Sequence, residues 1–273
     1  MNLVSDSEVL AMSNQQYREF IRQAPISGNI RQTERVRTVG RRIAAATEQY
    51  LIRCGLEAET GKFSWEFNLI RSDLANAWCM PGGKIVVYEG ILPFCQTDDE
   101  LATVLSHEVA HALAKHANER MSQQLLQRTG AQVLGQILSG SSTGAQIAGS
   151  VAYTIGTKVL FELPYSRQHE FEADKIGLYL MAMAGYDCKQ APTFWRRMAG
   201  SESGGGGGDF LSTHPASAKR VEAILEELPK VELFMHGSSQ AAPNPVPARN
   251  RSVTTDQTSP SGANRKVPLK THY

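Results

Sequence analysis

Apolar residues recur at every third or fourth position along several stretches of this chain, which is the spacing of helices that bury one face. The first two helices are predicted over 5–23 and 33–54. A third is predicted to begin at Asp98, with acidic residues in its first turn, and to continue past His116.

Further helices are predicted over 166–184, 188–198 and 215–228, and the last of them has Pro215 in its first turn. The inward face of that last helix is expected to comprise Ala218, Val221, Ile224, Leu225 and Leu228.

The hydrophobic period changes to two between the early helices. Aromatic and aliphatic residues alternate with polar ones over 63–69, as in a half-buried strand. Two more strands are predicted over 76–80 and 84–89, joined by the turn signal Pro-Gly-Gly at 81–83. Helices outnumber strands, so the predicted fold class is α+β, mostly helical with a small β-sheet.

We expect one domain over 1–236. The segment 130–156 is dominated by Gly, Ser, Ala and Gln, which is typical of a flexible connector or of a loosely packed helix of small residues. A second segment, 201–213, is predicted to be a Gly-rich loop. Residues 237–273 are rich in Pro, Ser, Asn and Thr and are predicted to form a disordered tail.

Composition narrows the class of protein. Hydrophobic residues make up 41% and charged residues 20% of the chain, and a net charge of +1 favours neither nucleic acid nor an anionic membrane as a partner. The sequence shows no secretory signal and no bilayer-spanning run, so the protein is either cytosolic or begins after a removed targeting segment. Small buried thiols are the favoured interpretation of the four cysteines, although two disulfides are permitted: Cys54, Cys79, Cys95 and Cys188.

The candidate chemistry lies in His107-Glu108-Val109-Ala110-His111, within the third helix. Two imidazoles four residues apart share one helical face and can bind one metal ion, while Glu108 can accept a proton from a bound water. The alternative is a helix with two surface histidines. The apolar neighbours favour an interior site, in which two histidines and a glutamate without a metal would be costly.

A catalytic zinc needs three protein ligands and an open position. His116 is a poor third ligand, because it lies five residues beyond His111 and therefore about 140° around a continuous helix. The metzincin pattern is also absent, since alanines stand at 114 and 117. We interpret His116 as a packing or surface histidine.

A better third ligand lies on the helix over 166–184. Glu170 and Asp174 are four residues apart on one face, so Glu170 can bind the metal while Asp174 accepts the second ring N–H of a histidine ligand, most plausibly His107. The alternative to a metal site is an exposed acidic face of this helix. Such a face explains Glu172 better than it explains Glu170 and Asp174.

With these motifs in place, the sequence resembles peptidase family forty-eight, the gluzincin zinc metalloendopeptidases. The resemblance covers about residues 1–230 and is closest to the soluble or lipid-anchored periplasmic branch of BepA and LoiP, because the transmembrane helices of HtpX are missing. It rests on four motifs in order: the Asn76-Ala77 strand before Pro81-Gly82-Gly83-Lys84, His107 to His111, the Ser-Arg-x-x-Glu-x-Glu-Ala-Asp run ending at Asp174, and Ser212-Thr213-His214-Pro215.

The resemblance implies a gluzincin-type domain whose small sheet packs on the metal-bearing helices. It implies one zinc ion per chain held by His107, His111 and Glu170, with Glu108 as general base on zinc-bound water. Asp174 becomes the supporting carboxylate. It also places His214 over the metal, where it could stabilise the oxyanion or occupy the fourth position and keep the enzyme latent.

The resemblance further implies an endopeptidase acting on unfolded or misfolded proteins in envelope quality control, in the bacterial periplasm or at the outer membrane. An N-terminal lipid anchor outside this sequence could attach it to a membrane. A latent, chaperone-like zinc protein that rarely cleaves is the alternative. An edge strand that pairs with extended substrate is expected to supply the substrate-binding residues, which are Asn76, Ala77, Trp78, Cys79 and Met80. Trp78 and Cys79 depart from the family, and we interpret them as packing residues rather than as parts of a substrate pocket.

Overall fold

The computed structural model describes residues 4–128, 164–201 and 208–237. The predicted segment 130–156 and the predicted tail after 237 lie outside the described residues. In chain order the elements are α1 (Asp6–Gln23), α2 (Ile30–Arg53), α3 (Glu57–Thr60), β1 (Glu66–Ile70), β2 (Ala77–Met80), β3 (Lys84–Tyr88), the 3-10 helix η1 (Glu89–Phe94), α4 (Asp98–Leu113), α5 (His116–Arg128), α8 (Arg167–Met183), α9 (Gln190–Ser201), α10 (Gly208–Thr213) and α11 (Ala218–Met235).

The sheet has three strands in the order β1-β3-β2. β3 runs parallel to β1, with Glu66 opposite Lys84, and antiparallel to β2, with Ala77 opposite Val87. β2 is therefore an edge strand. The turn between β2 and β3 needs glycine, because Gly83 has a φ of 82° and a Cβ there would lie 2.6 Å from the Trp65 ring.

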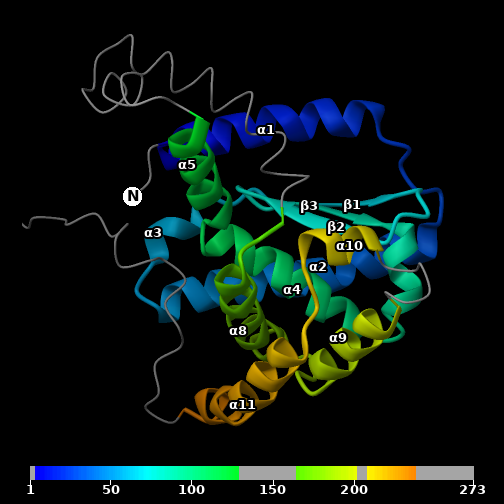
Figure 1. The fold of residues 1–273 in the computed structure, drawn as a ribbon, viewed down its shortest axis with the longest axis vertical. Helices are drawn as coiled ribbons and strands as arrows, with labels where there is room; N and C mark the ends of the chain where they lie inside the picture. Colours follow the sequence, from blue (N-terminus) through cyan, green and yellow to red (C-terminus); the bar gives the residue numbers. More distant parts are fainter. Residues whose placement is uncertain (1–3, 129–163, 202–207, 238–273) are drawn as a thin grey trace, which may run out of the picture.

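The elements form layers around this sheet. α1 covers one face, and α2 and α4 lie on the other, with α8, α9 and α11 beyond them (Figure 1). The face under α1 buries a small cluster that includes Tyr17, Trp78 and Val86. The opposite face joins the main core, which α2, α4 and α8 fill. The predicted α+β class, mostly helical with a small sheet, is confirmed.

α4 occupies the centre of the main core, so every residue from Glu100 to Leu113 is buried. Its N-terminus is capped by the Thr97 side chain, which accepts from Glu100 N at 3.2 Å. α8 packs against α4 more extensively than any other helix does among the described elements. The approach is close at Gly177, where a Cβ would meet His107 N at 3.3 Å.

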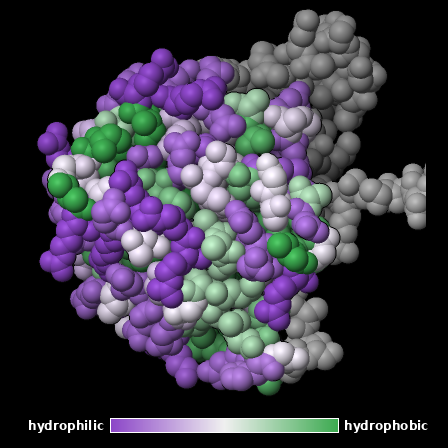
Figure 2. Space-filling view, turned by 180° about the vertical axis from the view of Figure 1, so that it is seen from behind, coloured by the Kyte–Doolittle hydropathy of each residue, from purple (hydrophilic) through white to green (hydrophobic). Residues whose placement is uncertain are grey.

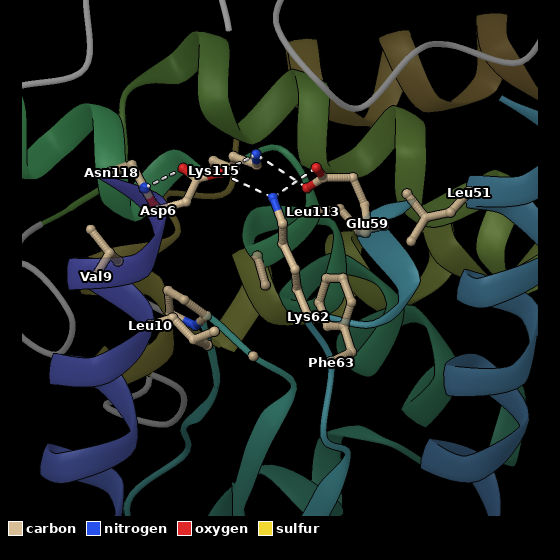
Figure 3. A pocket seen from close by; sticks show the side chains of 13 residues that line it. Asp6, Val9, Leu10, Leu51, Glu59, Lys62, Phe63, Leu113, Lys115 and Asn118 are labelled. Carbon is tan, nitrogen blue, oxygen red and sulfur yellow. Dashed lines mark hydrogen bonds and ion pairs between the residues drawn. The ribbon is translucent and has the colours of Figure 1, made fainter. Parts of the chain in front are cut away.

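The prediction of one continuous helix past His116 is wrong. α4 ends at Leu113, and α5 starts again at His116 after Lys115 adopts a φ of 58°. Two carboxylates from α1 and α3 bind the Lys115 side chain, since Nζ lies 2.5 Å from Asp6 Oδ2 and 3.2 Å from Glu59 Oε2. Figure 3 shows this ion-pair group above an apolar pocket between α1, α3 and the end of α4. Tertiary ion pairs thus stabilise a break that helical periodicity does not reveal.

The C-terminal segments also differ from prediction. Part of the predicted Gly-rich loop 201–213 is helical, as α10. α11 begins at Ala218 rather than Pro215, because the Ser217 side chain caps it, and it continues through Pro229. Its inward face was misjudged as well. Ala218 and Leu225 are exposed, whereas two charged residues, Arg220 and Glu227, are buried.

The surface carries both polar and apolar residues. On the face turned away in Figure 1, hydrophilic residues predominate and hydrophobic ones occur in smaller groups between them (Figure 2). Within the described residues, no helix combines the length and apolarity that a bilayer crossing requires.

Substitution of Lys115 tests the break. Lys115→Ala loses both ion pairs and keeps the left-handed backbone, whereas Lys115→Gly loses the pairs but relieves the backbone strain. We expect the glycine variant to be more stable than the alanine variant by about 1 kcal/mol in urea unfolding. Arg41, exposed within α2, is the matched control, where glycine should instead be less stable than alanine by about 1 kcal/mol. Equal behaviour at the two positions would contradict the strained break.

Candidate metal centre

Three predicted ligands from two helices converge. His107 and His111 lie one turn apart on α4, and Glu170 lies in the first turn of α8, which Ser166 caps. The Nε2 atoms of His107 and His111 are 3.0 Å apart. Glu170 Oε2 lies 3.4 Å from His107 Nε2, and Glu170 Oε1 lies 3.4 Å from His111 Nε2.

His214 joins this cluster from the end of α10. Its Nδ1 lies 3.3 Å from His107 Nε2 and 3.1 Å from Glu170 Oε1. The backbone holds it there, because His214 N donates to Phe210 O at 2.8 Å and the Phe210 side chain is fully buried. One ligand atom from each of the four residues lies within 4.8 Å of all the others.

The spacing of these atoms fits a metal ion. In a tetrahedral site with bonds of about 2.0–2.1 Å, neighbouring ligand atoms lie about 3.3 Å apart. The separations here, 3.0 to 3.4 Å, match that value. All four side chains are buried, so the same atoms packed together without a cation would be costly.

The charges in the cluster also favour a cation. Burial would lower the pKa of His107, but Asp174 and Glu170 outweigh it and raise the pKa to about 9. Burial lowers the pKa of His111 well below its usual range. The pKa of Glu170 lies far below its ordinary value despite burial, because His214 and His107 stabilise the carboxylate. The two carboxylates beside His107 therefore favour positive charge at this position.

Glu108 lies beside the cluster. Its Oε1 is 3.3 Å from His214 Nε2, and burial raises the pKa of its carboxyl above the ordinary value. It lines a cleft together with β2, Arg120, Tyr165 and His214.

The carboxylate of Asp174 and the guanidinium of Arg220 contact the candidate ligands from outside the cluster. Asp174 Oδ1 lies 2.9 Å from His107 Nδ1, as the sequence predicted. Arg220 donates to both oxygens of Asp174, at 2.7 and 2.6 Å, and its Nη1 lies 2.7 Å from Glu170 Oε2. This ion pair lowers the pKa of Asp174 although burial works against it. The role of Arg220 follows from its buried position on α11, which brings its guanidinium to both carboxylates.

Four of the five substrate-binding candidates form β2, and Asn76 directly precedes it. Asn76 and the four residues of β2 line the cleft that contains Glu108. Trp78 packs edge to face on Phe20 at 5.2 Å, in agreement with the packing interpretation. Burial raises the pKa of Cys79 well above its usual range. All four cysteines are free thiols, and three of them are buried.

Comparison with known proteins identifies the family. Residues 31–228 match Peptidase family M48. The chain belongs to this family.

The matched relatives are named as proteases. Mitochondrial metalloendopeptidase OMA1 of Schizosaccharomyces pombe is 39% identical over 170 residues, which is 62% of this chain and 48% of the relative. The human metalloendopeptidase OMA1, mitochondrial, is 32% identical over 66% of this chain and 36% of its own length. Beta-barrel assembly-enhancing protease of Yersinia pestis is 27% identical over 241 residues, 87% of this chain and 47% of the relative. The chain thus spans about half or less of the length of these relatives.

Two features of this M48 site differ from, or were missed by, the sequence analysis. His116 is not a surface histidine: it is buried, and its Nδ1 lies 2.8 Å from Nδ1 of His111. Burial lowers the pKa of His116. Tyr165 was missed, because it precedes α8 outside any periodic pattern. Its ring lies 3.8 Å from the His111 ring and 5.2 Å from the His214 ring, under the Arg120 guanidinium.

Removal of Arg220 tests the charge balance of the M48 site. Arg220→Ala leaves Asp174 and Glu170 buried without their cation, and we expect a loss of about 3–5 kcal/mol in urea unfolding of the chelator-treated protein. Arg37→Ala, which breaks an exposed pair with Glu34, is the control and should cost less than about 0.5 kcal/mol.

The loss should depend on pH. The folded pKa of Asp174 is lowered, so its contribution is present above the unfolded pKa of about 3.9 and is lost as the pH falls. The difference between wild type and Arg220→Ala should therefore narrow below about pH 4. A pH-independent difference would contradict this account.

Proposed function

We propose that this chain is a zinc-dependent endopeptidase that hydrolyses unfolded or misassembled proteins, with one zinc ion held by His107, His111 and Glu170. The observation that carries the proposal is the 3.0–3.4 Å convergence of these ligand atoms beside a buried Glu108. Membership of the M48 family and the names of its relatives support it.

The proposed mechanism assigns the proton transfers to Glu108. Zinc in such a site lowers the pKa of a coordinated water to about 7 and polarises a carbonyl. Glu108 accepts the proton of the attacking water and returns it to the leaving amine. The raised pKa of its buried carboxyl suits this role, because a base that must release its proton again works best with a pKa closer to neutral.

β2 is proposed to bind the substrate backbone. One edge of β2 pairs with β3, and the strand lines the cleft that contains Glu108. A peptide that pairs with this edge would lie extended across the cleft, so that its scissile carbonyl comes near Glu108. Backbone pairing requires a chain free of its own secondary structure, which favours unfolded substrates over folded ones.

A role in envelope protein quality control is proposed from the bacterial relative, whose name refers to β-barrel assembly. The corresponding location is the periplasm or the outer membrane, with an N-terminal lipid as a candidate anchor. Other relatives are mitochondrial, so the location depends on the organism that carries the chain. Fractionation of the native host with an antibody to the chain tests it, and recovery in the cytosol would contradict the periplasmic location.

A second candidate function is a latent, chaperone-like binding protein. The position of His214 beside the candidate ligands supports latency. With Nδ1 at 3.1–3.3 Å from Glu170 and His107, His214 occupies the position of a fourth ligand. As a fourth ligand it would take the coordination position that the attacking water needs. We propose that His214 holds the site latent and that displacement of α10 activates it.

Glu108→Gln tests the base. We expect casein cleavage to fall by roughly 10²–10⁴-fold, because the amide cannot accept a proton, while zinc content measured by mass spectrometry stays at one per chain. His236→Ala, exposed at the end of α11, is the control. Zinc-dependent cleavage that survives in Glu108→Gln would refute the mechanism, and turnover of small esters without protein cleavage would favour a different hydrolase.

His214→Ala separates two roles for His214, a fourth ligand that keeps the site latent and a group that stabilises the oxyanion. Loss of the fourth ligand should raise the initial rate of casein cleavage severalfold while the three remaining ligands retain zinc. Thr213→Ala, one residue earlier, controls for disturbance of α10. A fall in kcat at unchanged KM would instead assign His214 to stabilisation of the oxyanion.

A further inference from the structure

The two histidine ligands are supported in different ways. Metal-binding histidines usually donate their second ring N–H to an acceptor, which fixes the tautomer and the ring orientation. His107 faces a carboxylate, Asp174, at 2.9 Å. His111 faces another imidazole instead, since its Nδ1 lies 2.8 Å from Nδ1 of His116.

We infer that His116 is the positioning residue for His111, and that Glu172 fixes the tautomer of His116. Nε2 of His116 lies 3.2 Å from Glu172 Oε2, so the three side chains form a continuous line from the ligand cluster to the surface. The inference rests on the proposed zinc site.

The order of protons along this line follows from the chemistry of the groups. Glu172 is an acceptor only, so the proton of His116 sits on Nε2 and is donated to Glu172. Nδ1 of His116 is then a free acceptor, and His111 donates its Nδ1–H to it. His111 is left with a lone pair on Nε2, which is the atom that faces His107 and Glu170.

The break between α4 and α5 makes this contact possible. In a continuous helix His116 would point about 140° away from His111. The left-handed backbone of Lys115 turns the chain so that the two rings meet with centroids 4.9 Å apart. Asp6 and Glu59 hold Lys115 from the far side (Figure 3). Residues of α1 and α3 therefore contribute to the geometry of a ligand that they do not touch.

Packing fixes the His116 ring in this orientation. The ring stacks on His169 at 4.2 Å, and His169 Nε2 in turn lies 3.1 Å from Glu119 Oε2. These three side chains and Glu172 do not make a second metal centre, because His116 contacts Glu172 whereas His169 contacts Glu119. Among the described residues, the group of His, Cys, Asp and Glu whose ligand atoms converge is the one built on His107.

The support of His111 is also weaker than that of His107. Asp174 is buried and paired with Arg220, whereas the side chain of Glu172 is 42% exposed. A neutral imidazole polarises its donor less than a buried carboxylate does. We therefore expect the loss of His116 to weaken metal binding without abolishing it.

The experiment compares two replacements of His116 that differ in hydrogen bonding. Asn places an amide oxygen near the position of Nδ1 and can still accept from His111, whereas Leu keeps volume and loses the acceptor. Zinc affinity is measured by chelator competition. We expect His116→Leu to weaken zinc binding by roughly 10- to 100-fold and His116→Asn to restore most of it. His236→Ala is the control and should equal wild type.

A second readout separates positioning from general stability. The absorption bands of the cobalt-loaded protein report ligand geometry, and they should change in His116→Leu and return toward wild type in His116→Asn. Equal zinc affinity in wild type and His116→Leu, or equal losses in the Leu and Asn variants, would overturn the inference. If His116→Leu does not fold, Glu172→Ala replaces it; unchanged zinc affinity there would likewise overturn the inference. Failure of wild type to bind zinc tightly would instead overturn the proposed function.

Discussion

The centre of this molecule is a contact between two helices that buries charge. α4 and α8 meet at Gly177, close enough for His107 and His111 on one helix to face Glu170 and Asp174 on the other. Two buried carboxylates would oppose folding if they stood alone. Arg220 joins both of them from α11, and the histidines lie on their other side. Arg220 and the histidines thus offset part of the cost of burying these carboxylates, and a cation bound between the candidate ligands would offset more of it.

The candidate ligands are positioned by two kinds of element, the long helices α4 and α8 and the short helix α10. The ligands on α4 and α8 belong to the part of the core with the most extensive packing, so their geometry is held firmly. His214 differs, since it follows the short helix α10 and reaches the cluster from the side of the cleft. The cluster therefore combines residues of the central helices with one residue from a separate, shorter element.

Much of this could be predicted from the sequence. The His-Glu-x-x-His spacing and the pair Glu170 and Asp174 lie on regular helices, where the 3.6-residue repeat determines which side chains share a face. The strands β2, beside Glu108, and β3 were also predictable, because the Pro-Gly-Gly turn at 81–83 marks a hairpin between them. Local geometry was sufficient in each case. The cysteines were predicted to be small buried thiols, and the four are indeed free.

What the sequence by itself determined is therefore the set of candidate ligands, the candidate base and the class of fold, since all of these depend on short-range periodicity. Only the tertiary structure decided the positions of His116, Tyr165 and Arg220. His116 was expected to be a packing or surface histidine, and it is buried; its contact with His111 was not predicted, because the break at Lys115 depends on ion pairs with residues more than fifty positions away. Arg220 could not be distinguished from an exposed arginine until α11 was seen to turn it toward Asp174. Contacts between distant segments do not produce a periodic pattern in the sequence, and this site depends on such contacts.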